Sequence, residues 1–166
     1  MSKGSWLSRL LGRRSARAEP SPTDAAEWHD KGLALDRLGR HKEAVVCYEE
    51  ALACFDRGLE ITPRDSGLWK GKGRALVALE RLEEAVACLE RGLEIDPRDS
   101  DLWAAKGAAL GVLTRLEEAL ACFERALEIA PRKSILWLGK GAALRALGRF
   151  GQADECFLRA QELGGG

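Results

Sequence analysis

The sequence repeats itself at one fixed interval, and this period is its most restrictive feature. The same interval separates Trp69 from Trp103 and Trp103 from Trp137. Four other columns share it: Gly73, Gly107 and Gly141; Leu76, Leu110 and Leu144; Ala85, Ala119 and Ala153; Cys88, Cys122 and Cys156. Such a period is typical of arrays in which each unit stacks only on its neighbours. The search for function is therefore directed towards an extended surface.

Each unit is predicted to contain two antiparallel helices. A connector of proline, two polar residues and serine precedes a unit at residues 63–66, 97–100 and 131–134. The proline cannot continue the preceding helix, and the serine is expected to be the N-cap of the next one. A first helix of roughly 14 residues follows, and a second helix ends near the next proline. Because only stacking buries the apolar faces, we predict an all-α fold, an α-solenoid of antiparallel helix pairs.

The repeated residues resemble the tetratricopeptide repeat family over about residues 25–164. The resemblance rests on the Trp-x-x-x-Gly start, the central alanine, the closing proline, and an aromatic residue at Tyr48, Phe123 and Phe157. It implies a right-handed superhelix whose first helices line a concave groove. It also implies four repeats within a domain of residues 23–166, at about residues 25–65, 66–99, 100–133 and 134–164.

Two columns depart from the family pattern. Lysine occupies Lys31, Lys72, Lys106 and Lys140, where the family commonly has leucine. Leucine occupies Leu35, Leu76, Leu110 and Leu144, where the family commonly has tyrosine. We expect the lysine stems to cover apolar surface while their ammonium groups stay in water.

The first repeat is longer than the others by one heptad, since Trp28 lies further from Trp69 than Trp69 lies from Trp103. The additional residues have the form of a duplicated heptad, residues 47–53 followed by residues 54–60. A heptad is close to two helical turns, so the insertion lengthens the second helix by ~10 Å without rotating its apolar face far. Two interpretations follow: a protruding helix that offers a further docking edge, or a neutral in-register duplication.

The fourth repeat is predicted to close the array. Asp154 and Gln161 replace apolar residues of the earlier units and give the last helix a more polar outer face. Phe150, Phe157 and Leu158 lie near the same end. The sequence therefore leaves two oligomeric states open, a monomer and an end-to-end dimer.

The candidate binding surface is the groove that the resemblance places along the first helices. Its residues differ between repeats while the tryptophan, glycine and alanine columns do not. Lys70 and Arg74 form a basic pair suited to a carboxylate, and the later repeats offer small and apolar residues suited to aliphatic anchors. The candidate residues are His29, Leu33, Asp36, Lys70, Arg74, Val77, Asp101, Ala104, Ala108, Ile135, Leu138, Ala142 and Arg145.

No pattern in the sequence predicts catalysis, a metal or a cofactor. One cysteine per unit recurs at Cys54, Cys88, Cys122 and Cys156, and the first unit also has Cys47. None has the spacing of metal ligands, so we expect small buried apolar residues. His29 and His41 have no accompanying nucleophile pattern, and no phosphate-binding glycine loop is present. The chain also contains no asparagine, so the clamp by which some members of the family hold chaperone tails is not expected.

Residues 1–22 are predicted to be a basic amphipathic segment followed by a proline-containing linker. Residues 1–20 have five basic residues against Glu19, a net charge of +4, while the whole chain is neutral. Trp6, Leu7, Leu10 and Leu11 fall on one face of a helix, and Lys3, Arg9, Arg13 and Arg14 supply positive charge. A short helix that binds to anionic lipid has this pattern. Partner or self-docking and a flexible arm are the other interpretations. The residues concerned are Trp6, Leu7, Arg9, Leu10, Leu11, Arg13 and Arg14.

Together these patterns predict a non-catalytic scaffold that binds a peptide or partner protein in the groove. A cytoplasmic location is expected, either free or peripheral to a membrane through residues 1–14. A membrane adaptor is the alternative function. Helical-repeat recognition of RNA is a weaker alternative, and nucleic acid is not an expected partner, because residues 21–166 have a net charge of −4.

Overall fold

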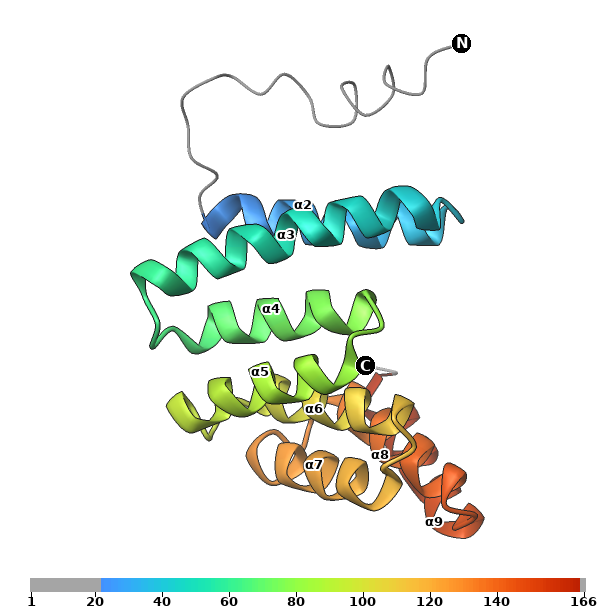
Figure 1. The fold of residues 1–166 in the computed structure, drawn as a ribbon. Coiled ribbons are helices and arrows are strands. Elements are labelled where there is room, and N and C mark those ends of the chain that lie inside the picture. The colour runs from blue at the N-terminus through green and yellow to red at the C-terminus, as the bar shows by residue number, and fades with distance from the viewer. Residues whose placement is uncertain (1–21, 165–166) are drawn as a thin grey trace, which may run out of the picture.

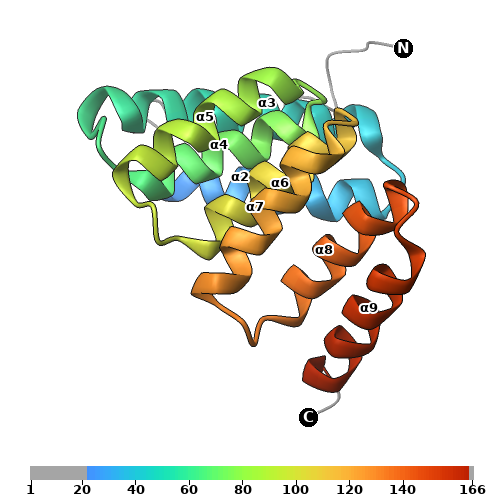
Figure 2. The same ribbon diagram turned by 90° about the horizontal axis from the view of Figure 1, so that it is seen from below.

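The computed structural model describes residues 22–164, which form eight α-helices in four antiparallel pairs (Figure 1). The pairs stack in chain order, and Figure 2 shows the last pair turned relative to the first. The pairs are α2 (Pro22–Arg37) with α3 (His41–Ile61), α4 (Ser66–Ala78) with α5 (Leu82–Ile95), α6 (Ser100–Val112) with α7 (Leu116–Ile129), and α8 (Ser134–Ala146) with α9 (Phe150–Gly164). The predicted α-solenoid is confirmed. Among the described helices, none has the length and apolarity needed to cross a membrane.

The predicted serine caps none of the helices α4, α6 and α8: aspartate is the N-cap of α4 and α6, and Lys133, without a side-chain cap bond, is the N-cap of α8. Asp65 precedes α4 and accepts a hydrogen bond from the backbone N–H of Leu68 at 3.0 Å. Asp99 precedes α6 and accepts from the backbone of Asp101 and Leu102. In α4 and α6 the serine expected as the N-cap is instead the first helical residue, because the preceding carboxylate reaches the free N–H groups and adds negative charge at the positive end of the helix.

The repeated tryptophans fasten each first helix to the connector before it. The indole N–H of Trp69 donates to the carbonyl oxygen of Pro63 at 2.9 Å. Trp103 and Trp137 make the same bond to the proline of their own connectors, at 3.0 and 2.8 Å. The tryptophan therefore satisfies its one polar atom while its ring packs between neighbouring units.

A large side chain on each second helix fits against a glycine of its own first helix. Tyr48 packs on Gly32, Leu89 on Gly73, and Phe123 on Gly107, and a Cβ at any of these glycines would press into the larger side chain. Because glycine has no side chain, the two helices of a pair lie closer together than they could with two ordinary side chains at the contact. The glycine column is therefore a packing requirement.

The same large residues also join successive pairs. Phe123 packs on Gly139 of α8 as well as on its own pair, and a Cβ at position 139 would overlap its ring. At the middle junction a leucine replaces phenylalanine, and the residue opposite Leu89 is Ala105. The separation along the sequence is the same in both cases. A large residue thus meets glycine and a smaller one meets alanine, which keeps the spacing of the pairs nearly constant.

The inserted heptad lengthens α3 and divides these two contacts between two residues. Helix α3 has 21 residues, whereas α5 and α7 have 14 each. Tyr48 packs on Gly32 within the pair, and Phe55, one heptad later, packs on Gly71 of the next pair. The expected lengthening without loss of the apolar face is confirmed, since Cys47 and Cys54 are both fully buried.

Ion pairs between lysine and an acidic residue cross every junction. The Lys72 ammonium lies 2.6 Å from the carboxylate of Asp56 on the preceding pair. The equivalent pairs Lys106 with Glu90 and Lys140 with Glu124 have distances of 2.8 and 3.0 Å. The lysine stems cover apolar surface as expected, but their ammonium groups are paired and not simply solvated. Lys72 and Lys106 also lie over the rings of Trp69 and Trp103.

The last helix lacks the features that a further pair would need. Asp154 and Gln161 are exposed, and Leu158 occupies the position of the junction acid. Leu158 is 59% exposed and Phe150 65% exposed. A further unit of the same sequence would therefore meet polar groups where apolar ones are required and lose its ion pair. Whether this end contacts a second copy stays a prediction.

We predict opposite effects for two glycine-to-alanine changes. Gly71→Ala should lower the free energy of unfolding by about 1–2 kcal/mol, because the added methyl overlaps Phe55 and this cost exceeds the gain in helix propensity. Gly111→Ala should raise it by up to ~1 kcal/mol, because position 111 is helical and a Cβ there meets open space. Urea unfolding followed by circular dichroism measures both. Equal effects of the two changes would contradict the close fit at the first junction.

Candidate functional site

The first helices form the inner side of the curved stack. Helix α2 contacts α4, α4 contacts α6, and α6 contacts α8, whereas no described second helix contacts another second helix. The first helices are therefore closer together than the second helices, and the face that they present is concave. This arrangement agrees with the groove that the resemblance implies.

Three adjoining hollows lie on this face, and Arg74 lines all of them. The first, of about 200 Å³, lies between α2 and α4 beside His29. The second, of about 410 Å³, extends from Leu33 and Asp36 to Ala108. The third, of about 470 Å³, lies between α4, α6 and α8. We call the three together the Arg74 groove.

Most of the predicted groove residues line the Arg74 groove. They are His29, Leu33, Asp36, Lys70, Arg74, Val77, Asp101, Ala104, Ala108 and Ile135. Leu138, Ala142 and Arg145 lie elsewhere on α8, exposed and outside these hollows. The guanidinium of Arg145 lies 4.4 Å from the ring centroid of Phe157 and so covers the last pair. On α8 the hollows are therefore lined by Ile135 and Gly139.

The structure separates the predicted basic pair into two different roles. The Lys70 ammonium lies 2.7 Å from a carboxylate oxygen of Asp99, across the junction between α4 and α6. Arg74 is exposed and forms no ion pair with any residue of the part of the chain that the structure describes. Arg74 is therefore the cation of the groove that is available to a ligand.

Asp99 is held in its charged form by the contacts that fix this junction. Burial alone would raise the pKa of its carboxyl group. The hydrogen bonds from Lys70 and from the backbone of Leu102 and Asp101 outweigh burial and hold the pKa below its usual value. The Asp99 carboxylate thus caps α6 and neutralises Lys70. Because these two side chains are paired with each other, neither is available to a charged ligand.

His29 lies buried beside Arg74, with 8% of its surface exposed. Its ring centroid is 5.7 Å from that of Tyr48, and its Nδ1 atom is 3.7 Å from a carboxylate oxygen of Asp30. Burial and, to a smaller extent, the charge of Arg74 lower the pKa of His29, while Asp30 opposes the shift. The lowered pKa favours a neutral imidazole, so Arg74 remains the positive group of this region.

Asp36 connects the helices of the first pair at the edge of the groove. It accepts a hydrogen bond from the Tyr48 hydroxyl at 2.8 Å and lies 3.0 Å from Nδ1 of His41. These two contacts lower the pKa of Asp36, and burial together with the Asp36 bond raises that of Tyr48. Asp36 is therefore engaged in holding α2 against α3.

The third hollow has an apolar floor that the sequence analysis did not identify. Ala104, Ala105 and Ala108 line one side, and Phe123 reaches the floor from the second helix of its pair. The ring packs on Gly139, which also lines the hollow, and Phe123 has 7% of its surface exposed. Ile135, 63% exposed, forms the rim. The separation of Phe123 from Gly139, which equals that of Phe55 from Gly71, is the signal from which this floor was predictable.

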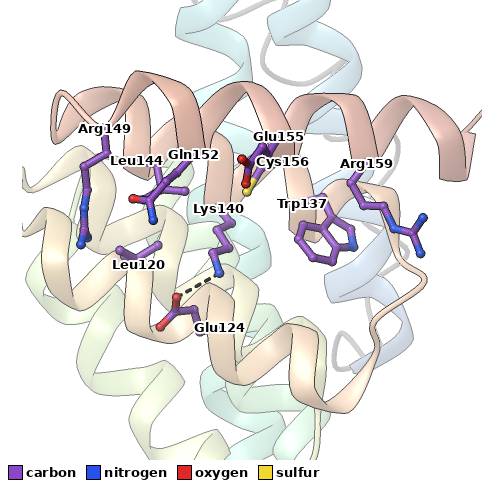
Figure 3. Close-up of a pocket in the computed structure, with 10 residues that line it drawn as sticks. All are labelled: Leu120, Glu124, Trp137, Lys140, Leu144, Arg149, Gln152, Glu155, Cys156 and Arg159. Carbon is purple, nitrogen blue, oxygen red and sulfur yellow. Dashed lines mark ion pairs between the residues drawn. The ribbon is translucent and has the colours of Figure 1, made fainter.

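A separate hollow of about 310 Å³ lies where α7, α8 and α9 meet (Figure 3). Figure 3 shows Arg149, just before α9, and Gln152 on α9 across from the Lys140–Glu124 ion pair. In the preceding pair, Arg115 binds the glutamate three positions later through two hydrogen bonds. Gln152 replaces that glutamate in the last pair, and Arg149 instead lies 3.8 Å from Glu117. The hollow contains groups of both charges and favours no single ligand class.

The five cysteines are buried and have free thiols. Burial raises the pKa of each thiol, which keeps the reactive thiolate scarce. Among residues 22–164, no three histidine, cysteine or carboxylate side chains gather in the way a metal ion requires. The cysteines therefore behave as the small apolar residues that their column predicted.

The residues predicted to contact a membrane or partner, Trp6 to Arg14, lie outside the described residues. That interpretation of the N-terminal segment stays a prediction.

Comparison with known proteins supports the helical repeat along almost the whole described chain. Family models described as tetratricopeptide repeat match residues 44–109, residues 25–55 and 100–133, and residues 135–163. No curated protein sequence matches the chain.

Solved structures of MamA have a similar fold. MamA MSR-1 is 22% identical, with a TM-score of 0.61 over 84% of this chain and 96% of that chain. The MamA RS-1 ArsTM double mutant is 23% identical, with a TM-score of 0.65 over 85% and 75%. Another MamA crystal structure is 14% identical, with a TM-score of 0.64 over 84% and 91%. At these identities the likeness concerns the fold.

We predict that the charge of Arg74 is detectable at His29. Arg74→Gln should raise the pKa of His29 in an NMR titration of its ring, but the pKa should remain below the ordinary value of about 6.5 because burial is the larger cause. In the unaltered chain, His29 becomes protonated at a higher pH in the unfolded state than in the folded state, because folding lowers its pKa. The free energy of unfolding should therefore decrease from about pH 6.5 down to the pKa of folded His29. Titration of His29 at or above its ordinary value would contradict this arrangement.

Proposed function

The chain belongs to the tetratricopeptide repeat family, and from this premise we propose that it is a non-catalytic scaffold that binds a peptide of a partner protein in the Arg74 groove. The observation that carries the proposal is that three adjoining hollows share one exposed arginine that no described residue pairs with. A continuous surface of this kind suits an elongated ligand better than a compact one.

The charges of the groove indicate that the ligand has a carboxylate. Lys70 is neutralised by Asp99, and Asp101 lies 2.9 Å from the ammonium of Lys133. Among the described residues, none supplies Arg74 with a counter-ion of this kind. A carboxylate of the ligand, from an acidic side chain or a peptide C-terminus, supplies one and accepts paired hydrogen bonds from the guanidinium.

The lining of the third hollow indicates that the same ligand also has an apolar group. Ala104 and Ala108 leave space beside Arg74, Phe123 supplies a flat floor, and Ile135 supplies an exposed aliphatic rim. An aliphatic side chain entering this hollow removes apolar surface of both partners from water. The proposed ligand is therefore a peptide with a carboxylate next to an aliphatic residue.

Rigidity favours binding in such a groove. The large-to-small contacts and the lysine–acid ion pairs join each pair to the next at every junction. The groove residues extend from helices that these contacts hold in place, so little ordering is needed when the peptide binds.

We predict that Arg74→Glu weakens peptide binding at least about tenfold. Peptides of a dozen residues are selected from a random displayed library on the unaltered chain, and fluorescence anisotropy of the selected peptide measures its affinity for each variant. Selected sequences should combine a carboxylate with an aliphatic residue. Lys70 is left unchanged because it stabilises a junction.

Arg132→Glu is the matched control, because Arg132 is exposed in a connector and forms no ion pair with a described residue. It should leave the affinity within about twofold of the unaltered value, since exposed charges at a distance contribute little. Equal affinities of the Arg74 variant and the unaltered chain would contradict the proposal. Equal weakening by both variants would assign the effect to net charge and would contradict it as well.

A further inference from the structure

The inserted heptad leaves part of α3 without a covering helix. Val45 is 41% exposed, whereas the equivalent Val86 and Leu120 are 6% exposed. Leu52, one heptad later, packs against the cluster of Leu76, Ala85 and Cys88 in the next pair. In Figure 1 the turn between α2 and α3 extends beyond the turn between α4 and α5. The insertion thus creates an overhang that no other described pair has.

A hollow of about 650 Å³ lies beneath this overhang, and we call it the overhang hollow. Its apolar part consists of Val45, Ala78 and Leu79. Glu49 and Glu80 are exposed on its rim and form no ion pair with a described residue. The one arginine there, Arg81, is bound by Glu84 through two hydrogen bonds. The overhang hollow therefore combines apolar surface with uncompensated negative charge.

We propose that residues 1–14 of the same chain dock in the overhang hollow. This segment has the complementary chemistry: Trp6, Leu7, Leu10 and Leu11 provide apolar surface at helical spacing, and its basic residues give residues 1–20 a net charge of +4. The apolar side chains cover Val45 and Leu79, and arginines approach Glu49 and Glu80.

The length of the intervening chain permits this contact. Residues 15–21 span up to ~23 Å when extended. The overhang hollow begins at Asp36, near the far end of α2 from Pro22, which is a distance of ~21 Å at the rise of an α-helix. The segment can therefore reach the hollow without any change in α2.

The Arg74 groove does not suit this segment, although it is also partly apolar. In the third hollow of that groove the charge that the described residues leave unpaired is positive, that of Arg74, and a basic segment would be repelled from it. The third hollow and the overhang hollow thus select ligands of opposite charge. Docking in the overhang hollow leaves the third hollow of the Arg74 groove accessible to a peptide, because the two hollows share no lining residue.

Hydrogen exchange of the complete chain, read by mass spectrometry, tests the docking. The amides of residues 5–14 should be protected in the unaltered chain. In Glu49→Lys/Glu80→Lys their protection should fall about tenfold, while the helices α5 to α9 keep theirs. Glu60→Lys/Glu83→Lys makes the same change in net charge at exposed positions outside the hollow and should leave residues 5–14 protected.

A charge exchange makes the test independent of folding defects. Adding Arg13→Glu/Arg14→Glu to the Glu49→Lys/Glu80→Lys chain should restore the protection. Unprotected amides in the unaltered chain, equal losses in both lysine variants, or no restoration would each overturn the proposal. Protection that increases with protein concentration would overturn it in favour of a second copy. Protection that appears only with phosphatidylserine vesicles would overturn it in favour of a membrane surface.

Discussion

The spacing of the whole array depends on the fit of one large side chain between two helices that have almost no side chain at the point of contact. Phe123 fills the space over Gly107 in its own pair and over Gly139 in the next. Leu89 meets alanine at the second of these positions, so the combined size is nearly preserved. The aromatic and glycine columns therefore act together, and the lysine–acid ion pairs follow from the approach that they permit.

The insertion in α3 shows how this constraint tolerates change. One residue makes both contacts in the third pair, whereas Tyr48 and Phe55 make one each in the first. Because the insertion is a whole heptad, both residues lie on the same face of the helix, and the stack continues without a defect. The consequence is at the surface: Val45 loses its cover, and a hollow with acidic groups forms beside it. The same change thus preserves the fold and creates a feature that the regular units lack.

The fold was predictable because a period states the same structural information several times. The cap was mistaken because Asp65 and Ser66 are adjacent and both favour the N-cap, so only the observed hydrogen bonds distinguish them. For the groove, most of the residues chosen by their spacing along a helix line the hollows, and their role in binding stays a prediction. Spacing missed the pairing of Lys70 with Asp99, which belongs to the next connector. It also missed Phe123, which reaches the groove from the other helix through the space left by Gly139.

A crystal structure of the chain from which residues 48–54 have been excised would test whether the fit of one large residue on two glycines sets the spacing of the pairs. The excision joins Cys47 to Phe55 and reproduces the order of cysteine and phenylalanine found at Cys122 and Phe123. We expect Phe55 then to pack on both Gly32 and Gly71, Val45 to become buried, and the overhang hollow to disappear. A structure in which Phe55 contacts only one of these glycines, or in which Val45 stays exposed, would contradict this expectation.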